Sequence, residues 1–600
     1  MSSRFRIYPA LGIARVGDAP GPGFIGPEHP GVPANWNFNT GSFNAFKEGG
    51  RIKRQGVRFR VFEFAQDGTL VGETLAGGGD VALVEWTVHV ANRKSSFFQF
   101  DGLGGENGDF SRNGARNDTI KKGDRSRLEM DPGPHSISGP SAAPVRLLNP
   151  NPQTSAIIED LGEISTDGAG RLVFFGGHGK TVQLAGAAAI ENYVNNDGWF
   201  DDVSDGPVSA AVQLRDGSRV DALGAWVSVG PPDFAPGIAN VVSLYETIWD
   251  TVVRSSRVHI PDLAMYRQGG SLERLKQQRD DWNAVTNRFA AYQPSYVNDV
   301  AHLLDRAFKA TFVHDPPDLQ KAFHNTMAPQ VWVDLGDPDS RKDVLRSDVF
   351  NRLRDPDSKD PADSRQMPRG LGDEYCDESA HPAGSRERTN PRRFFSLTRT
   401  QYAMLAQWAK AAPARSFSPD GNAPPSIPEA EPDVTPEGLD RAALENCVGG
   451  PFFPGIEVSW IVRNPRIYME PFRLRPGVKV ADGNPRVGIP DVTVRAGFLT
   501  QQMALPWQAD FRDCKREPLT HTETGAETWA MWWAGQRPDD VFPEADPTAQ
   551  VPWARPPHFT ASDTNSRRYK EMVANWSKQG FVSRLDPADK KRWLETERNP

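Results

Sequence analysis

The first 240 residues alternate apolar and polar side chains, and this pattern restricts the fold more than any other feature of the chain. Residues 57–64 and 81–90 have a two-residue period and are rich in β-branched side chains, as strands with one buried face are. A glycine run at 77–79 lies between them and indicates a turn. We therefore expect an antiparallel, β-rich domain over residues 1–245.

The periodicity changes after about residue 261. Residues 272–290 and 297–312 carry apolar side chains three and four positions apart, with charged residues between them. This spacing is typical of amphipathic helices. We expect a helical segment over residues 246–412, which includes a long charged loop or arm at about 351–394.

Residues 413–436 contain seven prolines, a composition that favours an extended linker. Residues 437–600 are then expected to form a C-terminal domain, with strands at 456–462 and 492–499 and a helical tail over 566–597. The whole chain is predicted to be α+β, with antiparallel sheets in the first half, a helical middle and a mixed C-terminal half.

Composition excludes several classes of protein. Three cysteines, none of them in C-x-x-C spacing, exclude a disulfide framework and zinc fingers. The 69 basic and 77 acidic residues give a net charge of −8, and no basic face indicates nucleic-acid binding. We find no signal peptide and no apolar run long enough to span a membrane. We expect synthesis and maturation in the cytoplasm, so that any export uses a route without a signal peptide.

Two motifs resemble ligand sites but have simpler interpretations. Residues 176–181 end like a phosphate-binding loop, but the pattern requires glycine at position 174, which is Phe174. A tight glycine turn is the better interpretation. Residues 195–206 contain several carboxylates that could bind a hard cation, but the closing glutamate of a calcium loop is missing. We expect a solvated turn there.

A third group of residues lies near the C-terminus. Asp510 stands four residues before Cys514, and Trp529, Trp532 and Trp533 follow within twenty residues. From the residue types alone, an aromatic core strand with a buried thiol is favoured over a chemical site. A thiol hydrolase built on Cys514 lacks a nucleophile signature and is disfavoured.

A set of short motifs, in this order along nearly the whole chain, resembles the LodA-like proteins. These are bacterial amino-acid oxidases that carry a cysteine tryptophylquinone made from their own side chains. The chain departs from the family pattern at Ala534 and Gly535. The motifs that carry the resemblance are residues 7–17, 24–28, 86–92, 197–202, 231–236, 447–450, 454–457, 505–514, 532–538 and 595–598.

The resemblance implies a role for each residue of the C-terminal group. Cys514 would supply the thioether sulfur of the cofactor, and Trp532 or Trp533 would become the quinone, with Trp529 as an outside candidate. Adjacent residues of an extended segment point to opposite faces, so only one of the pair can meet the sulfur. Asp510 would act as a base, first in cofactor formation and then toward the substrate. No metal ion is implied.

The resemblance also implies the reaction and its partners. A primary amine, expected to be an amino acid, would form a Schiff base on the quinone and leave as a carbonyl product and ammonia. Dioxygen would reoxidise the cofactor and yield hydrogen peroxide. A separate flavoprotein would modify the precursor, and the mature protein would be a homo-oligomer, a dimer or a tetramer. Two alternatives remain: a quinoprotein dehydrogenase that uses a protein electron acceptor, and a non-catalytic binding or structural relative.

Overall fold

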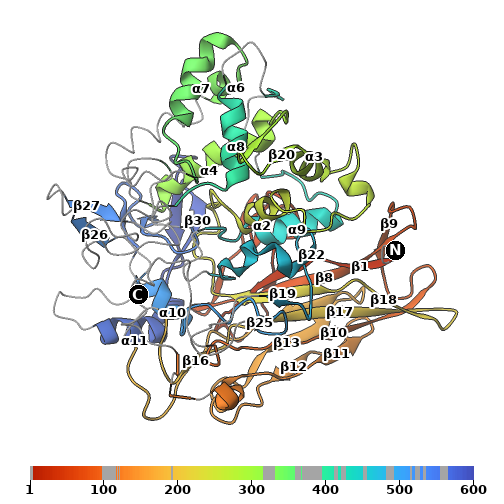
Figure 1. Cartoon of the computed structure of the whole chain (residues 1–600). Helices are drawn as coiled ribbons and strands as arrows, with labels where there is room; N and C mark the ends of the chain where they lie inside the picture. The colour runs from red at the N-terminus through yellow and green to blue at the C-terminus, as the bar shows by residue number, and fades with distance from the viewer. Residues whose placement is uncertain are drawn as a thin grey trace.

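The structure is a computed structural model of the chain (Figure 1). It describes residues 4–97, 116–117, 119–120, 122–190, 194–314, 332–357, 367, 395–410, 417–420, 427–450, 456–480, 492–513, 517–520, 527–530, 535–553 and 565–600.

A 13-stranded sheet occupies the first 230 residues, with the strand order β11-β10-β17-β19-β2-β8-β14-β13-β12. Strands β1, β3 and β9 pair with β8, and β18 pairs with β17. Pairing is antiparallel except for β19 with β2 and β3 with β8. The predicted antiparallel, β-rich first half is confirmed. The strands are β1 (Phe5–Tyr8), β2 (Leu11–Arg15), β3 (Phe24–Ile25), β8 (Gln55–Phe64), β9 (Leu70–Thr74), β10 (Val81–Val88), β11 (His135–Ser138), β12 (Val145–Leu148), β13 (Asp160–Thr166), β14 (Leu172–Phe175), β17 (Asp205–Leu214), β18 (Arg219–Asp221) and β19 (Ala225–Gly230).

Smaller strand pairs lie around this sheet. A four-stranded sheet near the C-terminus has the order β29 (Val551–Pro552), β28 (Asp540–Pro543), β31 (Trp593–Thr596) and β30 (Phe581–Leu585). The two-stranded pairs are β4 (Trp36–Asn37) with β5 (Ser42–Phe43), β6 (Lys47–Glu48) with β7 (Arg51–Ile52), β15 (Thr181–Gln183) with β16 (Trp199–Asp201), β20 (Trp282–Asn283) with β21 (Arg288–Phe289), β22 (Tyr468–Glu470) with β23 (Arg473–Leu474), β24 (Lys479–Val480) with β25 (Val492–Thr493), and β26 (Glu517–Thr520) with β27 (Glu527–Ala530).

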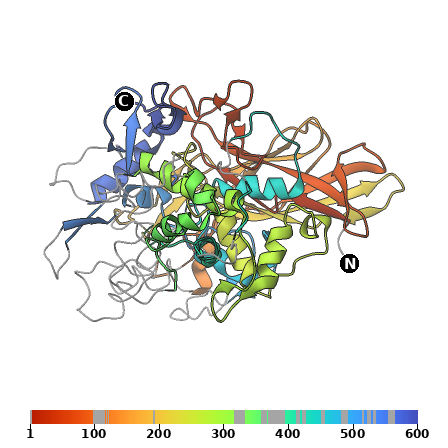
Figure 2. The ribbon, with the colours of Figure 1, turned by 90° about the horizontal axis from the view of Figure 1, so that it is seen from above.

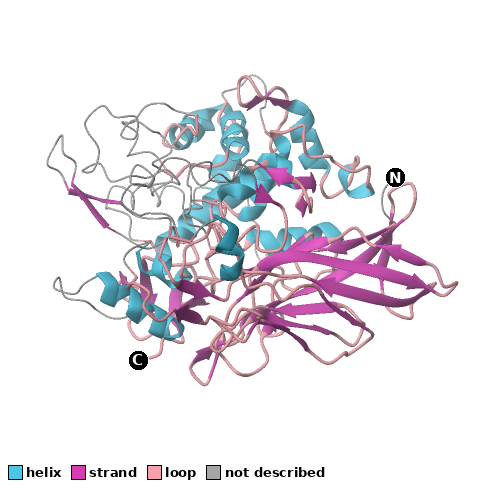
Figure 3. Ribbon diagram, turned by 60° about the horizontal axis from the view of Figure 1, so that its bottom comes forward, coloured by secondary structure: helices cyan, strands magenta, loops and turns pink. Residues whose placement is uncertain are grey.

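Helices cover one face of the large sheet, as the side view and the view from above both show (Figures 1 and 2). Helices α2 and α9 lie nearest to it, and strands and helices form separate layers (Figure 3). The α-helices are α2 (Leu244–Val253), α3 (Glu273–Asp281), α4 (His302–Lys309), α6 (Trp332–Gly336), α7 (Asp343–Phe350), α8 (Arg399–Trp408), α9 (Pro436–Glu445), α10 (Trp507–Asp513) and α11 (Asn565–Asn575). Short 3₁₀ or π turns lie at η2 (Lys122–Leu128), η3 (Ala264–Tyr266), η4 (Tyr296–Ala301), η5 (Ala310–Phe312), η7 (Ser340–Lys342), η11 (Trp460–Arg463), η12 (Pro465–Ile467) and η14 (Trp576–Lys578).

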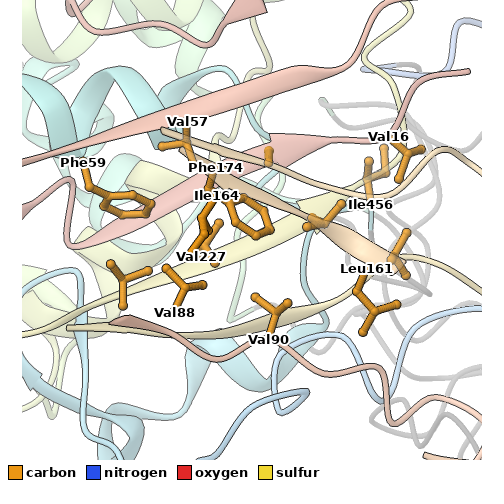
Figure 4. Packing of buried hydrophobic residues seen from close by; sticks show 14 of the residues in the cluster. Val16, Val57, Phe59, Val88, Val90, Leu161, Ile164, Phe174, Val227 and Ile456 are labelled. Carbon is orange, nitrogen blue, oxygen red and sulfur yellow. The ribbon is translucent and has the colours of Figure 1, made fainter. Parts of the chain in front are cut away.

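The main core lies on the face formed by alternate residues of the strands. Val57 and Phe59 of β8, Phe174 of β14 and Val227 of β19 point into it (Figure 4). The same hydrophobic cluster includes Trp507, Phe511, Trp576 and Phe581 from the C-terminal part. The first and last segments of the chain therefore share one core. The boundaries at 245, 412 and 436 stay a prediction.

Two predicted helices differ in outcome. Residues 297–312 are helical, because η4, α4 and η5 follow one another there, as predicted. The helix expected over residues 272–290 ends at Asp281 and gives way to the β20–β21 hairpin. The side chain of Asn283 accepts hydrogen bonds from the backbone N–H groups of Val285 and Thr286, and Asn287 has a φ of 50°. These local bonds favour a turn over helix continuation.

Three expectations for the C-terminal part are corrected. Residues 456–462 form no strand, and η11 begins at Trp460. Only Val492 and Thr493 of the expected strand 492–499 pair in a sheet, since Gly497 has a φ of 82° and turns the chain. The expected helical tail ends with η14, after which β30 and β31 form. No helix of the described residues is long and apolar enough to cross a membrane.

Candidate active site

Helix α10 carries the carboxylate that stands four residues before Cys514. The helix begins at Trp507, after the cis peptide bond between Leu505 and Pro506. Asp510 lies in its middle, and 1% of its surface is exposed. A carboxylate removed from water to this extent needs a partner for its charge.

Arg537 is that partner. Its Nη1 atom donates a hydrogen bond to Oδ2 of Asp510, and the two side chains form an ion pair. Arg537 is 3% exposed, and its guanidinium carbon lies 5.8 Å from the centre of the Phe511 ring. A neighbouring positive charge stabilises the ionised carboxylate. Asp510 is therefore held as a proton acceptor in a buried site.

Aromatic rings pack beside this ion pair. The Phe511 ring centre lies 5.2 Å from that of Trp507 and 5.9 Å from that of Phe234. Phe234 in turn lies 5.2 Å from Trp553, and Trp507 lies 5.2 Å from Trp576. These apolar neighbours exclude water, which strengthens the electrostatic interactions within the site.

A second buried ion pair fixes the start of α10. Oδ2 of Asp201 accepts a hydrogen bond from the backbone N–H of Trp507 at 3.0 Å and another from Nζ of Lys94 at 2.5 Å. Both charged side chains are completely buried. Burial lowers the pKa of Lys94 to about 8. A negative charge at a helix N-terminus is favourable, so Asp201 holds both the position and the direction of α10.

Arg116 binds the segment that leads into the helix. Its guanidinium is completely buried, and burial lowers its pKa to about 9. It donates hydrogen bonds to Oδ1 of Asn195 and to the backbone carbonyls of Lys94, Val194, Gln501 and Met503. One side chain thus connects three chain segments that are far apart in sequence.

The acidic stretch at residues 195–206 is not the solvated turn that the sequence predicts. Asp201, Asp202 and Asp205 are all buried. Asp205 accepts hydrogen bonds from Nε1 of Trp226 and from the backbone N–H groups of Leu499 and Thr500. These carboxylates are buried because donors from distant segments satisfy them. No group of three or more His, Cys, Asp or Glu residues that could hold a metal ion occurs among the described residues.

The glycine turn after β14 binds an anionic group, but that group belongs to the protein itself. The backbone N–H groups of His178 and Lys180 donate hydrogen bonds to Oδ2 of Asp202, at 2.6 and 3.0 Å. Gly179 has a φ of 71°, and a Cβ atom there would lie 2.2 Å from the Trp576 ring. The turn therefore requires glycine both for its conformation and for its close packing.

Two hydrogen bonds support the Arg537 segment. Gln536 donates from its side-chain Nε2 to the backbone carbonyl of Asn446 at 2.7 Å, and its backbone carbonyl accepts the N–H of Phe234 at 3.0 Å. Beside Phe234, burial raises the pKa of Asp233 to about 6. Burial also raises the pKa of the Cys447 thiol well above its usual value. This cysteine is therefore a neutral thiol and no nucleophile.

The structure describes only some of the residues that the sequence predicts for the site. Asp510 is described with its contacts. The backbone of Trp529 lies in β27, opposite Pro518 of β26. Cys514, Trp532 and Trp533 lie outside the described residues. Their roles stay a prediction.

Sequence reasoning missed Arg537 as the partner of Asp510. The two residues are 27 positions apart, and no periodic pattern connects them. The available signal was the motif at residues 532–538, which begins with the two tryptophans and contains Arg537. A buried carboxylate implies a cation nearby, and Arg537 is the first arginine after Trp533.

Three comparisons identify known proteins that this chain resembles. Residues 8–229 match the protein family described as "L-Lysine epsilon oxidase N-terminal", and residues 380–533 match "L-lysine epsilon oxidase C-terminal domain". The chain is 27% identical over 568 residues to the L-lysine 6-oxidase of Marinomonas mediterranea. That alignment covers 86% of this chain and 72% of the relative.

Solved structures share the fold. The crystal structure of the Schiff base intermediate of L-Lys epsilon-oxidase from Marinomonas mediterranea with L-Lys has a TM-score of 0.73 at 23% identity. A second structure of the epsilon-lysine oxidase from this organism has a TM-score of 0.74 at 24% identity. Both matches cover 99% of this chain and 95% of the other.

The buried carboxylate site and these matches define an oxidoreductase that acts on CH–NH₂ groups. The chain belongs to the LodA-like family of amino-acid oxidases, and the resemblance seen in the sequence is confirmed. The α+β fold is confirmed as well. Membership of this family implies a protein-derived quinone cofactor.

Proposed function

We propose that this chain oxidatively deaminates a free amino acid, using a cysteine tryptophylquinone formed from Cys514 and one of the tryptophans Trp532 and Trp533. The products would be a carbonyl compound, ammonia and hydrogen peroxide. The relative from Marinomonas mediterranea is an L-lysine 6-oxidase, so L-lysine is the first substrate to test.

The ion pair between Asp510 and Arg537 is the observation that carries this proposal. Asp510 stands four residues before Cys514, and Arg537 stands four residues after Trp533. Four residues of extended chain span at most about 14 Å. The ion pair therefore joins the two segments of the sequence that contain the predicted cross-link partners.

Trp532 and Trp533 are adjacent, so in an extended segment only one of the two can face the Cys514 sulfur. Both stay candidates for the quinone, with Trp529 third.

The residues described around the site fit such a cofactor. Indole must gain two oxygens before it can accept electrons, and the ring nitrogen loses its proton more readily beside a carboxylate. Asp510 is buried, paired with Arg537 and four residues before Cys514. When formed, the quinone supplies an electrophilic carbonyl that takes up two electrons from the carbon bearing the substrate amine.

Asp510 and Arg537 have distinct tasks in this reaction. Arg537 donates a hydrogen bond to Oδ2 of Asp510 and holds the carboxylate in place. A proton removed from the substrate carbon would pass to this carboxylate. Phe511 and Phe234 pack beside the pair and exclude water, which keeps the carboxylate basic and limits side reactions.

The remaining parts of the proposal concern partners. Dioxygen would be the final electron acceptor, and a separate flavoprotein would mature the precursor in the cytoplasm before any export without a signal peptide. The mature protein would be a dimer or a tetramer. Size-exclusion chromatography with light scattering measures the oligomeric state directly.

The decisive experiment uses protein produced together with its modifying flavoprotein. We expect a visible absorption band, a cross-linked peptide joining Cys514 to Trp532 or Trp533 with two added oxygens, and peroxide release with L-lysine or another amino acid. The variants Trp532→Phe and Trp533→Phe are each other's matched control, because only the one that removes the quinone residue should lose the band. An unmodified mass with no absorption, even with the flavoprotein present, would refute the cofactor. Dye reduction without peroxide would instead indicate a dehydrogenase.

A further inference from the structure

A second site for a small ligand lies beside the glycine turn at residues 176–180, apart from the Asp510 ion pair. A cavity of about 620 Å³ opens between this turn, the ends of the sheet strands and Trp576. Asp510 and Arg537 do not line it. Its volume is within the range of small-molecule sites, about 300–1,000 Å³. Its walls include Arg54, Glu163, His178, Lys180, Asp202 and Trp576.

Two buried charged groups in the cavity wall have unused hydrogen-bonding capacity. Asp202 is 1% exposed; its Oδ2 accepts two backbone N–H groups, but its Oδ1 has no partner among the described residues. Arg54 is 8% exposed and binds Glu163 and the carbonyl of Gly176 through its Nη atoms. Its Nε has no partner in the described part of the chain. Buried polar atoms of native proteins are nearly always bonded, so both atoms indicate a missing partner.

The two groups lie close to each other. Arg54 donates to the carbonyl of Gly176 at 3.2 Å, and Asp202 accepts the N–H of His178 at 2.6 Å. The Cα atoms of Gly176 and His178 are at most about 7 Å apart, because the two residues are separated by one position. The glycine turn therefore holds both side chains at the same part of the cavity wall.

The charges of the wall determine the kind of molecule. An anion alone would meet Asp202 and Glu163, and a cation alone would meet Arg54 and Lys180. A zwitterion avoids both repulsions because its ammonium can lie near the carboxylates and its carboxylate near the guanidinium. The indole of Trp576 adds an apolar surface for a side chain or a face for the ammonium.

We propose that this cavity binds a free α-amino acid, with the ammonium donating to Oδ1 of Asp202 and the carboxylate accepting from Nε of Arg54. The site is additional to the one around Asp510. It contacts α10 indirectly, since Trp576 packs 5.2 Å from Trp507, the first residue of that helix.

The test uses the full chain carrying Cys514→Ala, which cannot form the proposed cofactor and so cannot consume the ligand. The protein is produced with 5-fluorotryptophan in place of tryptophan and followed by fluorine NMR. The resonance of residue 576 is assigned with the variant Trp576→Phe. Titration with glycine and with L-lysine should shift this resonance to saturation. Acetate and methylamine, which each carry one of the two charges, should bind about tenfold more weakly or less.

Two variants locate the site. Asp202→Asn and Arg54→Lys should each weaken glycine binding by about tenfold or more. Asp262→Asn is the matched control, because Asp262 is 85% exposed and lines a different cavity. It should leave binding unchanged. Thermal unfolding shows whether each variant folds, and if Asp202→Asn does not, Arg54→Lys and the comparison with acetate decide.

Three results would overturn the inference. The absence of a saturable shift would leave ordered water as the partner of Oδ1 of Asp202 and Nε of Arg54. An equal response to acetate would show a simple anion site. Binding that survives both variants would place the amino acid elsewhere. None of these results bears on the proposed oxidase activity, because the test protein contains no quinone, and failure of that activity would leave this binding unaffected.

Discussion

Two buried ion pairs hold helix α10, one at its first residue and one at its middle, and they differ in where their partners come from. Asp201 and Lys94 both belong to the large sheet and its connections, and Asn92 also donates to Oδ1 of Asp201 at 3.2 Å. Asp510 instead pairs with Arg537, which follows β27 and the two candidate tryptophans. The first pair anchors the helix to a finished scaffold. The second joins the two segments that would carry the cofactor, so we assign stability to the first and chemistry to the second.

The largest expected effect separates these roles at Asp510. Asp510→Asn removes the base but keeps the shape of the side chain. The absorption band should be lost, because maturation needs this carboxylate, and deamination should then fall by at least about a thousandfold. Peroxide release and the visible spectrum measure the two effects.

The control for that variant is Asp510→Glu, which retains the charge and should recover part of the activity. A variant Asp510→Asn that keeps both colour and turnover would show that the ion pair with Arg537 is merely structural. It would also remove the difference between the two ion pairs.

At the start of α10, Asp201→Asn should act on stability. The amide can still accept the N–H of Trp507, but the ammonium of Lys94 loses its compensating charge in a fully buried position. We expect a loss of about 3–5 kcal/mol in the free energy of unfolding, measured with urea. Protein that does fold should still carry the quinone.

A double variant tests whether the anchor acts through charge. Lys94→Met combined with Asp201→Asn leaves no unpaired charge, and it should recover much of the stability that Asp201→Asn loses. If the two single losses simply add, the pair is not coupled. Its role as an anchor would then depend on the hydrogen bond to Trp507 alone.

The scaffold is the part of this comparison that could be predicted from sequence. The strands at 57–64 and 81–90 follow from local alternation, because one face of each is buried in the same core. The helix expected over 272–290 was wrong beyond Asp281, because the side-chain bonds of Asn283 form a turn that a count of apolar positions does not detect.

The site could be predicted only in part, because its interactions connect distant positions. Asp510 was identified from its motif, but its pairing with Arg537 is tertiary. The carboxylates of Asp201, Asp202 and Asp205 were read as solvated since acidic residues near glycine usually are. Their burial depends on donors such as Trp507 and Thr500, about 300 residues away, and no local pattern encodes such partners.

A smaller effect should appear in the dependence of stability on pH. Burial raises the pKa of Asp233 to about 6 from the usual value of 3.8, so the folded chain binds this proton more tightly than the unfolded chain does. The free energy of unfolding should therefore fall as the pH rises from about 4 to 6, by about 2–3 kcal/mol from this group.

Asp233→Asn isolates that contribution. Asp205 titrates in the same range, because burial raises its pKa to about 6 as well, so the difference between the parent chain and the variant is the quantity to measure. The difference should grow in favour of the variant from pH 4 to 6 and then stay constant. A flat difference would mean that Asp233 is ionised throughout, held so by the nearby Arg15.

The smallest expected effect concerns the geometry of the chemical pair. Arg537→Lys keeps a positive charge beside Asp510, so the carboxylate should stay ionised and maturation should proceed. It loses the planar guanidinium, with its Nη1 hydrogen bond to Oδ2 and its contact with Phe511. We expect kcat to fall about tenfold, which corresponds to about 1.4 kcal/mol, with little change in unfolding free energy. A loss of stability as large as that of Asp201→Asn, with kcat unchanged in the folded protein, would show that both ion pairs are anchors, and the chemical base would then have to be sought elsewhere.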